Sequence, residues 1–536
     1  MKIKDTYQKK NVIYDEYYIE YCQLNPIIGL NLKLYYNKSL FFNVYSNLYS
    51  RKMKKLITKY QYKLKDLDYK SLTNKIDQIN YLSFEYYLKI EHQKLRETNL
   101  HYLPINHQQN IFIDLLDIIL NDEILDLTNL SDIKTFQSFL QSFQIVIHSL
   151  ITILEKGIKR NITLQKRSCQ ILLEQLKSLL DNRIYQYRQI KPQLKIYFNK
   201  LMKKYFETSL KDFIIFLSTQ YLPFCRSTIG YIHLPDGLKT YKFLAKMETS
   251  LQNITLEEIH LLGLQEVDRL SKEIKTLTQA KKINNQKNTK LIKKSEDQLI
   301  KMYQQQQKGI NETIIPKYFG SLKPSVDYQI KPVPQYLQHS ANTAYYTDYD
   351  IDKRDGGTFF FNPRDCNYEH YSQVLSLHEG NPGHHYQLTI ANDLKIPKFR
   401  LFGPFNAFIE GWGLYSESLG NYQNYLEYLA KLDMEIHRAA RLVIDTGIHV
   451  YNWSYKQSYQ YLQKNTNLPN SEIESEIDRY IVWPGQALSY KMGQLTFIDL
   501  QKEYLKQISG NSLIRFHQTI IKYGPVPLQL LKKIIK

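Results

Sequence analysis

Apolar residues recur at three- and four-residue steps along most of this chain, and this spacing restricts the possible fold more than any other feature. The runs at 111–120 and 168–184 show it clearly, and Gly and Pro are sparse over the first 225 residues. Such spacing places apolar side chains on one face of an α-helix. With 536 residues, the chain can bury a large core without a disulfide or a metal. We therefore expect a mainly α fold, in which any metal is catalytic rather than structural.

The segment 311–375 breaks the helical pattern. Pro, Tyr and short apolar runs dominate it, and Thr-Phe-Phe-Phe at 358–361 is bounded by Gly-Gly and Asn-Pro, which predicts a short strand. We expect a small β-sheet there, before further helices that continue to the end. The polar stretch 275–310 is expected to be a helical arm or a mobile connection. We therefore expect a helical scaffold at 1–225 and a second region at 226–536, packed together as one large unit.

Charge and cysteine usage restrict the partners and the compartment. The net charge of +19 is typical of proteins that bind nucleic acid or anionic lipid. The basic residues are dispersed, however, and no nucleic-acid-binding motif is present, so we expect no nucleic-acid partner. The four cysteines lie far apart without a CxxC pair, which indicates reduced thiols.

The N-terminus gives a second indication of the compartment. It is polar and lacks the apolar core of a signal peptide, and the most apolar run, 139–154, is too short and too polar to span a bilayer. We therefore expect a cytoplasmic protein with no transmembrane segment. The oligomeric state is left open.

The segment LSLHEGNPGHHYQL at 375–388 carries the strongest chemical signal in the chain. It holds His378, Glu379, His384 and His385, so that three of the fourteen histidines lie beside one Glu. Two histidines one helical turn apart can bind a zinc ion at about 2.0–2.1 Å. A Glu beside the first histidine can take a proton from the metal's water. The pattern predicts one Zn²⁺ site, whereas ordinary surface or core histidines are the alternative.

The spacing within this segment is unusual. His384 and His385 follow His378 by six and seven residues, which is about 9 and 10.5 Å along a straight helix and too far for joint ligation. Pro382 cannot donate a backbone hydrogen bond, and the flanking glycines relax the backbone. We predict a bulge of the helix within Gly380–Gly383 that brings the second histidine back toward the first. The spacing alone leaves both His384 and His385 open as the second ligand.

A third ligand is expected from the segment 406–420. Glu410 lies there among apolar residues such as Phe408 and Trp412, which argues against the alternative of a partly exposed helix acid. Glu417 follows seven residues later, on the same helical face. One carboxylate can bind the metal while the other hydrogen-bonds a ligand or a substrate amine.

These motifs resemble a known family. HEGNPGHH followed by EGWGLYSE looks like the zincin-like proteins catalogued as DUF885, and it is more distantly similar to the gluzincin metallopeptidases, where a Glu from a second helix completes the site. Gly383-His384 resembles the Gly-His that ends the HExGH motif of thimet-type oligopeptidases, with two extra residues inserted. This alignment favours His384 over His385.

The resemblance covers most of the last 310 residues or so. LPDG at 234–237, RAARLVIDTGIHVYNWS at 438–454 and RYIVWPGQALSYKMGQ at 479–494 match its blocks, whereas the first 225 residues match no motif. The resemblance implies a large helical zincin-like enzyme with a small β-sheet preceding the metal-binding helix. It also implies Zn²⁺ held by His378, His384 and Glu410.

Other residues are candidates for supporting roles. Arg441 and Asp445 are four residues apart and can pair on one helix face, as an ordinary ion pair or as support for the metal. Tyr490 or His449 could donate a hydrogen bond to an oxyanion, although core packing explains Tyr490 equally well. An extended peptide could pair with the strand at 358–361. The expected substrate-binding residues are Thr358, Phe359, Phe360, Arg479 and Lys491.

The function expected from these motifs is that of a zinc-dependent metallohydrolase that cleaves peptides, with Glu379 as general base. The substrate would be a peptide or a small amide. One alternative is a metal-dependent amidase or esterase that acts on other substrates. Two further alternatives are a degenerate member that only binds peptides and a basic scaffold protein that contacts nucleic acid.

Overall fold

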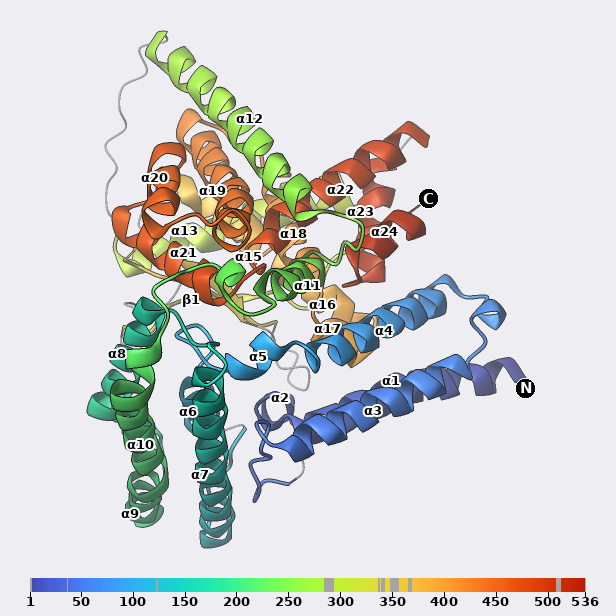
Figure 1. Ribbon diagram of the computed structural model, residues 1–536. Coiled ribbons are helices and arrows are strands. Elements are labelled where there is room, and N and C mark those ends of the chain that lie inside the picture. Colours follow the sequence, from blue (N-terminus) through green and yellow to red (C-terminus); the bar gives the residue numbers. More distant parts are fainter. Residues whose placement is uncertain are drawn as a thin grey trace. The chain divides into compact units, whose positions relative to one another are not determined.

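A computed structural model describes residues 2–35, 37–121, 124–283, 294–335, 338, 343–347, 356–364, 369–507 and 512–535. Helices make up most of these residues, and a single three-stranded sheet accompanies them in the described part of the chain (Figure 1). The prediction of a mainly α fold with a small sheet is therefore confirmed. The chain forms two compact units, one comprising Met1–Ser71, Phe84–Thr240 and Ile481–Trp483, the other Leu72–Ser83, Tyr241–Tyr480 and Pro484–Lys536.

The first unit is built from long helices around one apolar core. Its helices are α1 (Lys2–Leu24), α2 (Pro26–Asn31), α3 (Asn47–Lys65), α5 (Thr98–Tyr102), α6 (Ile111–Leu120), α7 (Leu130–Ile158), α8 (Lys166–Asn182), α9 (Pro192–Leu201) and α10 (Thr208–Phe216). Helix α4 (Lys75–Lys94) begins in the second unit and ends in the first. Phenylalanines of α6, α7 and α10, among them Phe112, Phe143 and Phe213, pack together in the core. Helix α7 alone among the described helices is long and apolar enough to cross a membrane, but half of its most apolar window is buried.

The second unit holds the predicted motifs. Its helices are α11 (Gly237–Thr249, which starts in the first unit), α12 (Leu256–Ile283), α13 (Glu296–Gly309), α14 (Ile315–Phe319), α15 (Ser372–Glu379), α16 (His384–Asp393), α17 (Lys398–Leu401), α18 (Asn406–Glu417), α19 (Tyr425–His449), α20 (Tyr455–Asn465), α21 (Asn470–Val482, whose end belongs to the first unit), α22 (Leu488–Gln507), α23 (Ser512–Tyr523) and α24 (Leu528–Ile534). Of the predicted polar arm at 275–310, α12 and α13 account for both ends, and 284–293 lie outside the described residues. Cys366 also lies outside them, whereas Cys22, Cys169 and Cys225 are free thiols.

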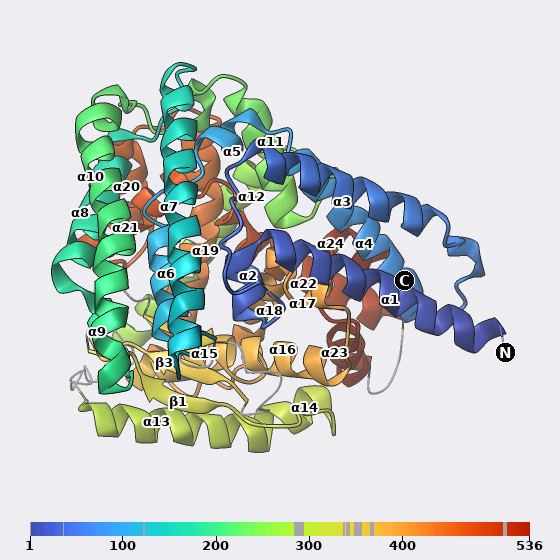
Figure 2. The same ribbon diagram turned by 90° about the horizontal axis from the view of Figure 1, so that it is seen from below.

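The small sheet has the strand order β1-β3-β2. Strand β3 (Thr358–Phe361) pairs in parallel with β1 (Gln329–Pro332) and antiparallel with β2 (Ala344–Thr347). The alternating burial of β3 directs Phe359 and Phe361 into an apolar cluster with Tyr303 of α13 and Leu375 of α15. Figure 2 shows α13 running along the sheet. The sheet thereby ties α15, the helix that carries His378, to α13.

Two glycines let α18 and α22 approach closely. A Cβ atom on Gly411 would lie 2.3 Å from the Cα atom of Gly493, a distance that real Cβ atoms do not show. The backbones can therefore meet only because neither residue has a side chain. This contact fixes α18 against α22 directly beside Glu410.

Candidate metal centre

The helix does not bulge at Gly380–Gly383 but ends and restarts there. Helix α15 stops at Glu379 and α16 begins at His384, so the predicted bulge is wrong in form. Pro382 has no amide hydrogen to continue the helical pattern. A Cβ atom on Gly383 would lie 1.9 Å from the carbonyl oxygen of His378, so only glycine lets the chain fold back over the end of α15. This return brings His384 beside His378.

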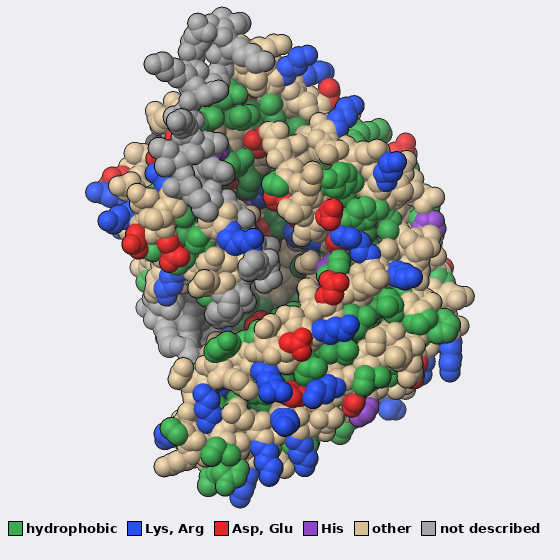
Figure 3. Space-filling model, turned by 90° about the vertical axis from the view of Figure 1, so that its left-hand side faces the viewer, with side chains coloured by type: hydrophobic (Ala, Val, Ile, Leu, Met, Phe, Trp, Pro, Cys, Tyr) green, Lys and Arg blue, Asp and Glu red, His purple; other side chains and the backbone are tan. Residues whose placement is uncertain are grey.

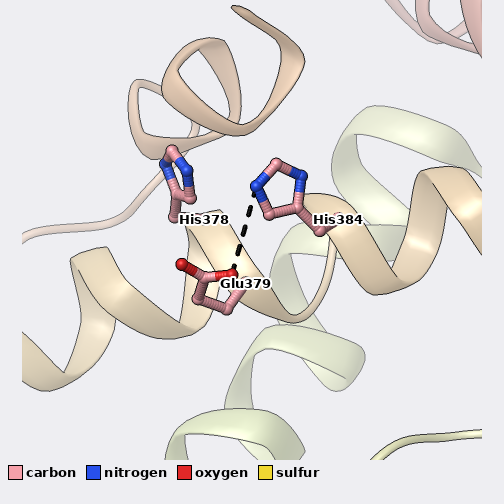
Figure 4. A group of neighbouring side chains, drawn as sticks. All are labelled: His378, Glu379 and His384. Atoms are coloured by element: carbon pink, nitrogen blue, oxygen red, sulfur yellow. Dashed lines mark ion pairs between the residues drawn. The ribbon is translucent and has the colours of Figure 1, made fainter. Parts of the chain in front are cut away.

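Three side chains from the two helices point toward one another (Figure 4). The possible ligand atoms of His378, Glu379 and His384 all lie within 4.8 Å of one another. The two imidazole rings stand at 89° with centroids 4.8 Å apart, and His384 Nε2 lies 4.0 Å from Glu379 Oε2. Perpendicular imidazoles at this separation can direct their nitrogens at one ion.

Glu410 of α18 faces the same two imidazoles. Its Oε2 lies 3.5 Å from His384 Nε2 and 3.9 Å from His378 Nε2. Burial alone would raise the pKa of Glu410, but the two imidazoles outweigh this effect and hold the pKa well below its ordinary value. Gly413, one turn later, leaves space for the rings, because a Cβ atom there would lie 2.9 Å from His378 Nε2.

Glu417 fixes the orientation of the His378 ring through a contact with its Nδ1 atom. Glu417 Oε1 lies 2.8 Å from His378 Nδ1, and both side chains are buried. This bond occupies Nδ1 and leaves Nε2 directed toward His384 and Glu410. Burial lowers the pKa of His378, but the surrounding carboxylates, Glu410 and Glu417 first, raise it overall to about 9. At zinc sites, the ring nitrogen that does not bind the metal usually contacts a carboxylate in this way.

Two carboxylates therefore flank the histidine pair, and their other contacts distinguish them. Glu379 Oε2 accepts a hydrogen bond of 2.9 Å from the backbone N–H of Tyr346, in strand β2. Glu410 instead lies close to both imidazole Nε2 atoms. Glu410 is thus better placed as a third candidate ligand, and Glu379 as a group that would lie beside a bound ion.

His385 lies outside the cluster. It is fully buried, with Nδ1 3.1 Å from the Tyr346 hydroxyl and Nε2 3.1 Å from the carbonyl oxygen of Val326. Burial lowers its pKa to about 4. Both ring nitrogens therefore have protein partners, and of the two histidines left open by the spacing, His384 is the one beside His378.

Arg441 and Asp445 have partners other than each other. Arg441 Nε lies 3.0 Å from Glu476 Oε2, and its guanidinium lies over the Tyr490 ring, 4.6 Å from the centroid. Asp445 accepts hydrogen bonds from the Tyr241 hydroxyl and, at 3.0 Å, from the N–H of Gly485. Both buried side chains thus find their polar partners outside α19 rather than in each other.

The remaining candidates also have partners outside the histidine cluster. His449 Nε2 lies 2.9 Å from the carbonyl oxygen of Tyr480. Arg479 Nη2 donates to Gln486 at 2.7 Å. Lys491 is fully buried and forms ion pairs with Glu435 at 2.8 Å and Glu266 at 2.9 Å. These contacts explain the burial of the three side chains without a substrate.

The predicted role of β3 in substrate binding requires correction. Both edges of β3 are already paired, so the backbone of Thr358, Phe359 and Phe360 cannot pair with a peptide. The four bulky residues mark an interior strand, and β2 is the edge strand next to Glu379. The sequence does not predict the contact between Tyr346 and Glu379. Tyr346 makes it with its backbone N–H, a group that does not depend on the side chain.

Comparisons with known proteins agree on the fold. The "putative lipoprotein" of Colwellia psychrerythraea has 22% identity and a TM-score of 0.86, covering 99% of this chain and 98% of its own. A "putative lipoprotein of unknown function" from Shewanella oneidensis has 18% identity and a TM-score of 0.76, covering 97% and 98%. No curated protein matches. A family model described as "Bacterial protein of unknown function (DUF885)" matches residues 34–535, nearly the whole chain, and the protein therefore belongs to the DUF885 family.

Proposed function

We propose that this protein is a zincin-like, zinc-dependent metallohydrolase that acts as a peptidase. The observation that carries the proposal is the meeting of three potential ligand atoms. Nε2 of His378, Nε2 of His384 and Oε2 of Glu410 come from three helices, and the carboxylate lies 3.5 and 3.9 Å from the two nitrogens. Their chemistry fits zinc, since two imidazoles and one carboxylate are a usual ligand set for catalytic zinc.

The burial of the site supports a bound cation. His378 is 4% exposed and is approached by Glu410, Glu417 and Glu379. Glu417 is fully buried, whereas Glu379 and Glu410 are half-buried, and carboxylates gathered in this way are costly unless a positive charge compensates them. His378, His384 and Glu410 would hold the ion. When bound, zinc supplies Lewis acidity, which lowers the pKa of water toward 7 and polarises a carbonyl group.

The chain's own residues would move the proton. The Glu379 carboxylate would accept a proton from the attacking water and return it to the leaving amine. The N–H of Tyr346, 2.9 Å from Oε2, holds this carboxylate in place. Glu417 keeps the His378 imidazole in one tautomer through Nδ1, so that Nε2 stays free to bind the metal.

The edge of β2 supports a peptide as substrate. Asn362 N–H donates to the carbonyl oxygen of Thr343 at 2.8 Å, so the antiparallel alternation directs the backbone groups of Ala344 and Tyr346 away from β3. Because the Tyr346 N–H already donates to Glu379, an extended peptide could pair with the Ala344 backbone groups on this outer edge. Because Tyr346 also contacts Glu379, a peptide bound there would pass beside the general base.

The test combines metal analysis with peptide cleavage. We expect purified protein to bind one zinc ion and to cleave members of a peptide library, and Glu379→Gln to retain the zinc while its cleavage rate falls by at least about 1000-fold. Absence of stoichiometric zinc from metal-replete protein would overturn the proposal. Cleavage of esters or small amides but of no peptide would leave a metallohydrolase and refute the peptidase. Peptide binding without cleavage by the wild type would indicate a degenerate member.

A further inference from the structure

The helix formed by α9, the π-helical segment Met202–Glu207 and α10 carries a concentrated positive charge. Residues 183–216 include eight Lys and Arg but only Glu207 and Asp212 as acids. Asp212 is exposed, whereas Glu207 is buried, accepts a hydrogen bond from Tyr185 and forms ion pairs with Arg183 at 3.3 Å and Lys211 at 3.7 Å. Arg188 is buried as well, so the surface charge rests mainly on the remaining lysines. This bias is local and lies within the first unit, far along the chain from the histidine cluster.

Large apolar side chains share this surface. Ile196 is 74% exposed, Tyr197 55% and Ile215 57%, while Tyr187, just before the helix, is 71% exposed. Scattered single apolar residues are ordinary on protein surfaces. Here they lie on both sides of a group of exposed lysines along one helix. We call this surface the α9–α10 face, which comprises Ile196, Tyr197, Lys200, Lys203, Lys204, Lys211 and Ile215.

The π-helical segment keeps these residues in one stripe. In a regular α-helix, residues 196 and 215 would point about 100° apart around the helix axis. The extra residue in a π-helical turn compensates for this angle. The opposite face stays in register with the core, where Phe198, Phe206 and Phe213 are buried. At the lower end of Figure 3, which α7, α9 and α10 form in Figure 1, Lys and Arg side chains gather among hydrophobic ones.

We propose that the α9–α10 face docks the protein onto an anionic lipid bilayer. The lysines would contact lipid phosphates, and Ile196, Tyr197 and Ile215 would enter the headgroup region, as in basic amphipathic helices that lie on membranes. A nucleic acid would use the lysines equally, but it would give the exposed isoleucines no apolar environment. The bilayer interface satisfies both kinds of side chain, which is why it is the favoured partner.

The experiment uses the full chain and vesicles of defined composition. Flotation is measured with phosphatidylcholine alone and with phosphatidylcholine mixed with phosphatidylglycerol. We expect binding to the mixed vesicles only. The triple variant Lys200→Gln, Lys203→Gln, Lys204→Gln should bind them on the order of 100-fold more weakly, since each lysine near an anionic surface contributes about fivefold.

A matched variant separates this face from net charge. Lys52, Lys54 and Lys55 are exposed on α3 of the same unit, so their triple substitution by Gln removes the same charge elsewhere. It should leave vesicle binding within about threefold of the wild type, since general screening weakens distant charges. An equal loss in both triple variants would overturn the proposal.

The apolar residues and the competing partner complete the test. The double variant Ile196→Ser, Ile215→Ser should bind the mixed vesicles more weakly. Added salt should fully reverse the binding that remains. Fluorescent single-stranded RNA and duplex DNA are titrated in parallel. Failure of the wild type to bind the mixed vesicles, or nucleic-acid binding that depends on the same lysines in the absence of vesicle binding, would overturn the proposal. Zinc content and peptide cleavage should be the same in every variant.

Discussion

At the scale of single residues, the choice between His384 and His385 depends on where each side chain points. His384 Nε2 lies 3.5 Å from Glu410, whereas His385 contacts Tyr346 and Val326. We expect His384→Ala to lose stoichiometric zinc and His385→Ala to keep it. His385→Ala should instead lose about 1–3 kcal/mol of unfolding free energy, because it leaves buried polar partners unsatisfied. Metal analysis and chemical denaturation of both variants distinguish these outcomes, and zinc loss in His385→Ala alone would reverse the assignment.

Asp445 should make stability depend on pH. Burial raises its pKa from 3.8 to about 7, although the hydrogen bonds from Tyr241 and Gly485 lower it in part. Between these values the folded protein binds a proton that the unfolded chain has lost, so the unfolding free energy falls as pH rises. The stabilisation that the bound proton of Asp445 provides is fully present below the pKa of the unfolded chain, and it is lost as the pH rises through the pKa of the folded protein.

Asp445→Asn removes this titration. The variant should lack that part of the decline in unfolding free energy, which is on the order of 4 kcal/mol for the wild type. Denaturation curves on either side of the window measure it, and Glu427→Gln, at a half-buried first-turn position of the same helix, serves as the control. An unchanged pH slope in Asp445→Asn would show that another group is responsible.

At the scale of elements, the close approach of α18 to the histidines should depend on Gly413. Added Cβ atoms would lie 2.9 Å from His378 Nε2 and 3.1 Å from His384 Cε1, so Gly413→Ala must displace the rings. We expect zinc affinity to fall by about 10–100-fold, as when the support of a metal ligand is lost. Competition with a chromophoric chelator measures the affinity.

Gly309 provides the matched control. It also lies in a helix, and a Cβ atom there would have nothing within 4 Å. Gly309→Ala should leave zinc affinity unchanged and raise stability by up to about 1 kcal/mol, because Ala is the better helix former. Equal zinc affinity in Gly413→Ala and the wild type would mean that the rings are not confined by α18.

The elements also show which parts of the structure could be predicted. Helices such as α6 and α8 follow from apolar spacing, which is local, and the brief strand β3 follows from its Gly and Pro boundaries. The spacing from His378 to His384 shows only that a straight helix cannot bring the two side chains together, so it does not distinguish a bulge from the break observed between α15 and α16. The sequence does not predict which strands pair with β3, because β1 and β2 are contributed by other segments of the chain.

The same limit applies to the partners of buried charges. Arg441 pairs with Glu476 of α21, 35 residues away, rather than with Asp445 four residues away. Spacing on one helix predicts that a pair is possible, but the packing of helices decides whether it forms. The ligand candidates were more accessible to prediction, because HEGNPGHH and EGWGLYSE each carry their residues within one short segment.

At the scale of the whole molecule, all candidate ligands belong to the second compact unit. His378, His384 and Glu410 lie in Tyr241–Tyr480, whereas Phe84–Thr240 forms most of the other unit around its own core. Each unit is large enough to bury an apolar core without a metal. Removal of zinc should therefore weaken the second unit without unfolding the protein.

This separation predicts a selective effect of zinc on stability. A ligand that binds only the folded state adds about 2.7 kcal/mol when its concentration is 100 times its Kd. Calorimetry with zinc and with a chelator should show a higher transition temperature with zinc, and hydrogen exchange should assign the added protection to α15, α16 and α18. The first unit's α6 and α7 should exchange at unchanged rates, since they carry no candidate ligand. Unfolding of both units on chelation would instead make the metal structural and contradict its assignment to catalysis.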